Sequence, residues 1–164
     1  MTRWFFRVSL LFFLAWVTAL GPRLLFAAEI VVDELSDFDF GEVPPSAGEL
    51  SAESAFCVAL SDRGNYQISA LTSAARGEFL LQGVDGSVSR GIGYRVFVSE
   101  SGSGLGTELM PGLPLSGLRS GARLPDGSCP RPLPRITVII TAEQLGQAPP
   151  GAYRGILGFT VAPE

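Results

Sequence analysis

Short segments in which apolar and polar residues alternate recur along this chain, and glycine, proline, asparagine or aspartate closes almost every one of them. Alternation at every second residue places one set of side chains on one face of a β-strand. The turn residues fix φ or permit positive φ, so the chain can reverse direction after a few residues. No apolar pattern of helical period longer than one turn follows residue 28. The sequence therefore predicts an all-β fold, and specifically a β-sandwich.

Most of the expected strands alternate, but RITVIITAE at 135–143 is nearly continuous in β-branched residues, as in a strand covered on both faces. The stretch 101–134 is rich in glycine, leucine and proline, which predicts a long loop with at most one poor strand. Thr141 and Gln144 have capping-box spacing and predict one short helical turn. Strands are expected at 38–43, 53–60, 65–71, 77–83, 94–100, 135–143 and 151–164.

The last expected strand runs almost to the end of the sequence. Tyr153, Leu157, Phe159 and Val161 share one parity, and only three residues follow Val161. Terminal residues fray unless the last element is tied into a sheet. We therefore expect this strand to be paired, with these four side chains facing the core.

The first 28 residues have the features of a secretory signal peptide. Arg3 and Arg7 precede the apolar run 8–21, and small residues follow at Ala27 and Ala28. A glycine, a proline and an arginine then interrupt the apolar stretch, so the unbroken span of about 20 residues that a membrane anchor needs is not available. We expect export, with cleavage within a residue or two of Ala28 and contact with the membrane only through this leader.

The charge of the mature chain argues against a nucleic-acid partner. Removal of the leader takes away three of the twelve basic residues and no acidic one, which leaves nine arginines against sixteen acids and a net charge of −7. The arginines are scattered, and a phosphate backbone requires a basic stripe. Some 136 mature residues suit one domain, which we expect over 37–164.

Motifs for catalysis or metal binding are poorly represented. The chain has no histidine and no lysine, so the common bases that activate a nucleophile are absent. The acids within 33–42 alternate with apolar residues and do not supply the oxygen positions of an EF-hand loop. SGSGLG at 101–106 resembles a phosphate-binding turn, but Pro111 and Pro114 prevent a helix from following it. We predict no enzyme, no cofactor and no metal site; an exported carboxylate hydrolase is the alternative that the composition disfavours.

The two cysteines, Cys57 and Cys129, both lie in the mature chain. In an exported protein an even cysteine count favours a disulfide over a metal site or a thiol nucleophile. No basic group other than scattered arginine is present to lower a thiol pKa. We predict a structural disulfide between them.

Several motifs in order resemble one family. They are DFDFGEV, FCVALSDRGNYQISA, RGIGYRVFVSESG, DGSC and the terminal pattern from Gly151 to Pro163. Together they resemble the spore coat protein U domain family, which is similar to the subunits of archaic chaperone–usher pili. Residue by residue, the match covers Phe40-Gly41, Cys57 with Tyr66, Tyr94, and Gly151, Tyr153, Leu157 and Val161 of the terminal strand.

The resemblance implies an immunoglobulin-like β-sandwich that lacks its final strand. Such a domain exposes a groove along its last strand, here the strand of Tyr153, Leu157, Phe159 and Val161. A periplasmic chaperone fills the groove first, and the N-terminal extension of the next subunit then replaces it at an outer-membrane usher. This is β-strand addition, in which main-chain hydrogen bonds supply the affinity. The implied destination is the periplasm and then the cell surface, as part of a pilus.

The expected donor segment is 29–36, in which Ile30 and Val32 share one parity. Glu34 and Ser36 interrupt this apolar face, whereas a shaft subunit would carry a longer alternation. The alternative is a self-complete periplasmic or tip sandwich that acts in cell adhesion as a binding module. In that case the loop at 101–134 would contact a ligand.

Overall fold

The structure is a computed structural model that describes residues 30–33, 35–44, 47–60, 64–72, 74, 77–84, 91–100, 104–121, 128–129 and 131–164. The predicted leader and two residues of the expected donor segment, Glu29 and Glu34, lie outside these ranges. Within the described residues no helix is long and apolar enough to cross a membrane.

The described chain is built almost entirely of β-strands, with one short helix. The strands are β1 (Ile30–Asp33), β2 (Leu50–Ala55), β3 (Cys57–Leu60), β4 (Asn65–Thr72), β5 (Leu80–Gly83), β6 (Ile92–Gly93), β7 (Arg95–Ser99), β8 (Thr107–Leu109), β9 (Leu115–Arg119), β10 (Arg135–Ile140), β11 (Tyr153–Arg154) and β12 (Leu157–Pro163), and the helix is α2 (Ala142–Gly146).

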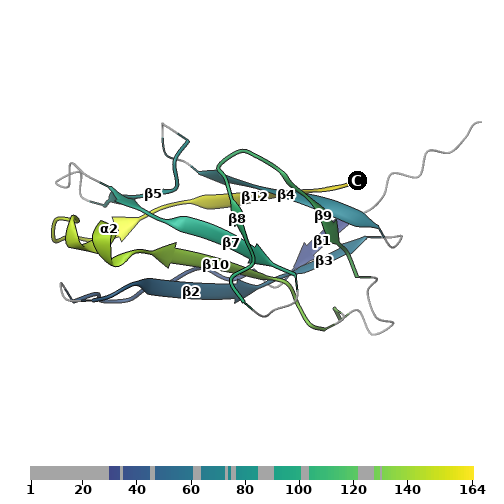
Figure 1. The fold of residues 1–164 in the computed structure, drawn as a ribbon, viewed down its shortest axis with the longest axis horizontal. Coiled ribbons are helices and arrows are strands. Elements are labelled where there is room, and N and C mark those ends of the chain that lie inside the picture. Colours follow the sequence, from purple (N-terminus) through teal and green to yellow (C-terminus); the bar gives the residue numbers. More distant parts are fainter. Residues whose placement is uncertain are drawn as a thin grey trace, which may run out of the picture.

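Two antiparallel sheets form the layers of the sandwich, in the orders β2-β10-β7-β8 and β12-β4-β9. Smaller groups, β1-β3 and β11-β5-β6, extend them. Figure 1 shows that β2, β10, β7, β4 and β12 run along the long axis of the molecule. One hydrophobic core joins the layers, because inward residues of β4 and of β7 and β10 belong to the same buried cluster. The fold is the all-β sandwich that the sequence predicted.

The strand β10 lies in the interior of its sheet, between β2 and β7. All its residues after Arg135 are buried, including Thr137 and Ile139, which alternate with the core-facing Ile136 and Val138. Burial on both faces is what the β-branched composition of this segment predicted. The helix α2 follows directly, with Thr141 as its N-cap accepting a hydrogen bond from the Gln144 N–H over 3.3 Å.

The prediction of a strand at 38–43 is wrong, because this segment turns at Gly41. The N–H of Gly41 donates to Asp39 Oδ1 over 2.9 Å, and Gly41 has a φ of 61°, which a strand does not allow. Ser36 N–H donates to Ser54 Oγ over 2.9 Å and ties the segment to β2. Phe38 and Phe40 still pack against the core, so the apolar pattern reported burial but not secondary structure.

Two further expectations need correction. The expected strand 53–60 is divided at Phe56 into β2, which pairs with β10, and β3, which pairs with β1. The stretch 101–134 holds two strands, β8 and β9, rather than at most one. Gly106 allows β8 to start close to β7, since a Cβ there would lie 2.0 Å from the carbonyl oxygen of Val98. These are backbone constraints that hydrophobic alternation does not encode.

Candidate functional site: the free edge of β12

The terminal strand β12 is hydrogen-bonded along one edge only. It pairs antiparallel with β4, in a regular register from Leu157 opposite Thr72 to Pro163 opposite Tyr66. β4 in turn pairs with β9 on its other side. Among the described residues no strand forms a ladder with the second edge of β12. The sheet therefore ends at β12 with an unpaired row of backbone groups.

The register identifies which amides point toward the free edge. The N–H of Glu164 donates to the carbonyl oxygen of Asn65 over 3.0 Å, so every second pair from there is a hydrogen-bonded pair. In an antiparallel ladder the intervening residues direct their N–H and C=O groups to the opposite side. Leu157, Phe159 and Val161 are these intervening residues. Their backbone groups are available to another strand, while Pro163 has no N–H to offer.

The core under β12 is incompletely covered. Leu157, Phe159 and Val161 pack against the core, but each is only partly buried, and Thr160 between them is exposed. The cross-strand neighbours of Val161 and Phe159 on β4 are fully enclosed: Ile68 is 1% exposed and Ala70 is 0% exposed. Inward-facing side chains are therefore less buried on β12 than on β4. One more strand beside β12 would cover the remaining apolar surface.

The expected donor residues Ile30 and Val32 lie in β1, which pairs with β3 of the same chain. Ile30, opposite Leu60, packs against the core, whereas Val32, opposite Val58, is 44% exposed. Some Cα atoms of β1 and β12 lie within 8 Å of each other, but the two strands form no ladder. Figure 1 shows β1 at the same end of the sandwich as the C-terminus of β12. Both strands thus have an unpaired edge at this end.

The C-terminus is tied to the sheet at its last residue. Besides its backbone bond to Asn65, Glu164 accepts a hydrogen bond from Gly117 N–H at Oε2 over 2.9 Å. At the other end of the terminal segment, Tyr153 lies in β11, pairs with β5 and donates its hydroxyl to the carbonyl oxygen of Pro149 over 2.5 Å. The four predicted terminal-strand residues therefore lie on two short strands with different partners, β5 and β4.

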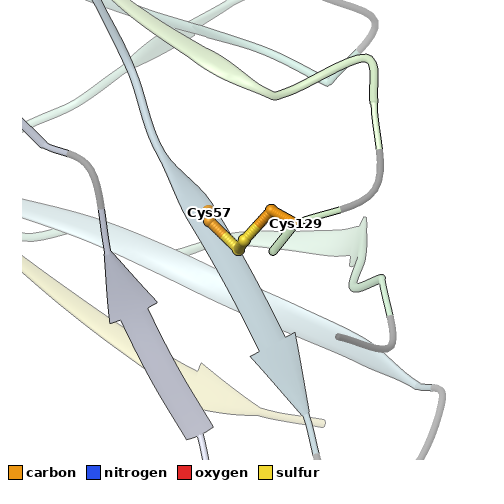
Figure 2. Close-up of a disulfide and its surroundings, with 2 residues drawn as sticks. All are labelled: Cys57 and Cys129. Atoms are coloured by element: carbon orange, nitrogen blue, oxygen red, sulfur yellow. A yellow bond between two sulfur atoms is a disulfide. The ribbon is translucent and has the colours of Figure 1, made fainter. Parts of the chain in front are cut away.

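The predicted disulfide between Cys57 and Cys129 is present, with a Cα–Cα distance of 6.1 Å across 72 residues of sequence. Figure 2 shows the bond leaving β3 toward the segment before β10. It fastens the end of the long 101–134 connection to the strand that also pairs with β1. The disulfide therefore holds one end of the sandwich together.

One ion pair links two neighbouring strands of a sheet. Arg95 donates to both carboxylate oxygens of Glu108, Nε to Oε1 over 2.8 Å and Nη2 to Oε2 over 2.6 Å, and so joins β7 to β8. The hydrogen bond from Arg95 lowers the pKa of the Glu108 carboxyl. In the described part of the chain, no three His, Cys, Asp or Glu side chains cluster as a metal site would require. What β12 offers is a backbone edge with an apolar surface beside it.

Sequence reasoning located β12 and its parity but missed its surroundings. It did not place β1 beside β3, because strand pairing depends on contacts that are distant in sequence. It also missed that Tyr66, Arg119 and Arg131 lie around one cavity. A partial signal existed: Arg131 follows Cys129 by two residues, so the disulfide had to bring it close to the strand of Cys57.

No protein-family model matches the chain, and no curated protein matches it in sequence. The structure is similar to a chain in a chaperone–tip adhesin complex described as vital for synergistic activation of CFA/I fimbriae biogenesis, with a TM-score of 0.55 and 15% identity. The match covers 84% of this chain and 41% of that chain, less than half of its length. The P pilus rod subunit PapA matches with a TM-score of 0.44 and 17% identity, over 84% of this chain and 99% of that one. At such identities the first likeness shows a shared fold, and membership of the spore coat protein U domain family stays a prediction.

Proposed function

We propose that this protein is a structural subunit of a chaperone–usher type pilus or surface fibre, and that the free edge of β12 accepts a β-strand from another polypeptide. The observation that carries the proposal is the combination of an unpaired β12 edge with half-buried inward side chains. The fold shared with a chain of a fimbrial chaperone–adhesin complex supports it. In this role the protein catalyses no reaction and needs no cofactor.

Strand addition would use two kinds of contact. The incoming backbone would bond to the outward N–H and C=O groups of Leu157, Phe159 and Val161, which supplies affinity without regard to sequence. Its alternate side chains would then cover the exposed parts of these three residues and so complete the core. An uncovered edge of this kind is an aggregation hazard, which explains why a periplasmic chaperone would hold it before assembly. The order would be export, chaperone capture, and replacement of the chaperone by a neighbouring subunit at an outer-membrane usher.

The donor segment in this proposal is 29–36 of the next subunit. Because β1 pairs with β3 in the same chain, donation requires that β1 leave β3 first. Only four residue pairs join the two strands, and Val32 contributes little burial. Release of β1 would therefore break a short ladder and uncover the part of the core that Ile30 contacts. Ile30 and Val32 would then enter the groove of the neighbouring subunit.

The experiment is co-expression with the periplasmic chaperone and usher encoded in the same genome, comparing the wild-type chain with a variant that lacks 29–36. We expect the variant to be captured by the chaperone, because β12 is intact, but not to be added to the preceding subunit. Undiminished assembly of the variant would contradict the donor role. Failure of the wild-type chain to copurify with any chaperone would contradict the acceptor role.

The alternative is a self-complete domain that acts as a binding module, and the pairing of β1 with β3 within one chain favours it. This alternative expects the exported chain to be a soluble monomer that unfolds cooperatively without a chaperone. Strand addition expects the free chain to aggregate or to require the chaperone. Purification of the chain with and without chaperone co-expression therefore separates the two functions.

A further inference from the structure

Exposed apolar side chains gather where β4 ends. In the described part of the chain, five large apolar side chains are more than half exposed. Val84 follows β5, and the other four lie near the last residues of β4. These four, here called the β4-end patch, are Leu71, Met110, Leu113 and Ile156. Single exposed apolar residues are ordinary, but a group of them marks a surface that contacts another molecule.

Three segments bring the β4-end patch together. Leu71 is the last residue but one of β4 and pairs with Gly158 of β12. Ile156 lies two residues before Gly158. The turn between β8 and β9 carries the other two patch residues, and it is held against β4 because the Gly112 N–H donates to the carbonyl oxygen of Ala70 over 2.8 Å. The patch therefore forms only when these strands have assembled.

The patch continues into an outer sheet face that carries no charge. The inward residues of β4 and β12 belong to the core or pack against it, so the alternate residues face outward. The outward residues are Gln67, Ser69 and Leu71 on β4, and Gly158, Thr160 and Ala162 on β12. None of them is buried, and four of the six are Gly, Ala, Ser or Thr. This part of the sheet is therefore flat, uncharged and accessible.

The charge of the chain favours a second copy as the molecule that covers this face. The chain has sixteen acidic and twelve basic residues and a net charge of −4. Two like-charged copies repel each other where charged surfaces meet, and the repulsion is smallest where both surfaces are uncharged. A basic partner would gain no attraction from a face without acids. Two flat sheets can also stack face to face, at a separation of about 10 Å.

We propose that two copies of this chain pack face to face through the outward residues of β4 and β12, and that each copy covers the β4-end patch of the other. A two-fold axis relates the copies, so both use the same surface. This contact uses the face of the sheet, whereas strand addition uses the edge of β12. The two contacts can therefore coexist, and either proposal can fail without the other.

The test is sedimentation velocity of the purified chain over a range of concentrations, alone or in complex with a chaperone. We expect reversible association of two copies. Leu71→Ser should weaken the association at least about tenfold, because each copy loses one apolar side chain from the contact. The matched control is Leu105→Ser, since Leu105 is 44% exposed but lies before β8, outside the patch. This control should associate as the wild type does.

A charge swap at Thr160 tests whether the two faces meet. Thr160→Asp should abolish association, because it places like charges on the two opposed faces. An equal mixture of Thr160→Asp and Thr160→Arg should associate more tightly than either variant alone, which a folding defect would not produce. Both Leu71 and Thr160 are exposed, so the monomers should keep the denaturation midpoint of the wild type.

Four outcomes would overturn the proposal. They are a wild-type chain that stays monomeric, equal weakening by Leu71→Ser and Leu105→Ser, no gain in the mixture of Thr160 variants, and association that survives both Leu71→Ser and Thr160→Asp. The last outcome would place the contact elsewhere, such as at the edge of β12. Chaperone capture should be unchanged in Leu71→Ser, because the edge of β12 is intact. Loss of capture in that variant would assign the patch to the chaperone and not to a second copy.

Discussion

A charge at Phe159 should act very differently from the same charge one residue later. Phe159 faces the core opposite Ala70, whereas Thr160 is exposed opposite Ser69. Phe159→Asp removes a half-buried aromatic ring and places a carboxylate against the interior. Thr160→Asp adds the same carboxylate to a side chain that already lies in water. The two variants therefore carry the same new charge at neighbouring positions of one strand, and they differ in the face that receives it and in the side chain that is lost.

The expected magnitude follows from the burial. Truncation of a fully buried phenylalanine costs about 3–5 kcal/mol, so a half-buried ring should account for about 2 kcal/mol. Desolvation of a buried, unpaired polar group adds about 1–3 kcal/mol, and more for a charge. The sum approaches the total stability of a marginal domain, about 5 kcal/mol. A substitution at an exposed site such as Thr160 changes stability by about 0.5 kcal/mol or less.

The assay is chemical denaturation of both purified variants, with copurification on a chaperone as a second readout. We expect Phe159→Asp to unfold the chain or to abolish chaperone capture, and Thr160→Asp to behave as the wild type in both respects. Equal tolerance of the two variants would refute the assigned face of β12. Equal loss in both would show that the strand is covered on its outer face as well.

Three further predictions concern the sandwich itself. Reduction of the Cys57–Cys129 disulfide should lower the free energy of unfolding by about 4 kcal/mol, which is the chain-entropy value for a loop of 72 residues. An unchanged denaturation midpoint under reducing conditions would contradict a structural role of the disulfide. Gly106→Ala should lower the free energy of unfolding by at least about 1 kcal/mol because the backbone is left-handed, and by more because the new Cβ would collide with Val98. Gly104 also has a positive φ but lies in open space, so Gly104→Ala should lose only the backbone contribution. Equal denaturation midpoints for the two variants would contradict the crowding at Gly106. Because Arg95 lowers the folded-state pKa of Glu108, their pair stabilises the chain above the unfolded pKa of 4.5 and loses this contribution as the pH falls through the folded-state pKa. Glu108→Gln should therefore be less stable than wild type at pH 7, by under about 1 kcal/mol, and the difference should shrink as the solution is acidified below pH 4.5; a difference that does not change with pH would contradict the ion pair.

For some strands, the pattern of apolar residues within the segment was sufficient to predict the strand. Residues 65–71 and 135–143 were predicted as strands because alternation and β-branching depend directly on burial. The first is a strand throughout, and the second is a strand as far as Ile140, after which the chain enters α2. The segment of Phe38 and Phe40 has the same alternation but bends at Gly41, where an Asx turn and a positive φ override the pattern. The break at Phe56 has no local signal, because it depends on which strand lies alongside.

The candidate site was predictable in part for the same reason. The parity of Leu157, Phe159 and Val161 is a property of one strand and can be read from the sequence. The absence of a ladder on one edge of that strand is a property of the sheet, and only the paired register shows it.

The most direct test of the account is amide hydrogen exchange along β12, measured with and without the bound chaperone. In the free chain the N–H groups of Leu157, Phe159 and Val161 should exchange rapidly, and the intervening amides, which bond to β4, should be protected. Chaperone binding should protect the first set and leave the second unchanged. If the first set is already protected in the free chain, or stays unprotected in the complex, β12 is not the edge at which a strand is added.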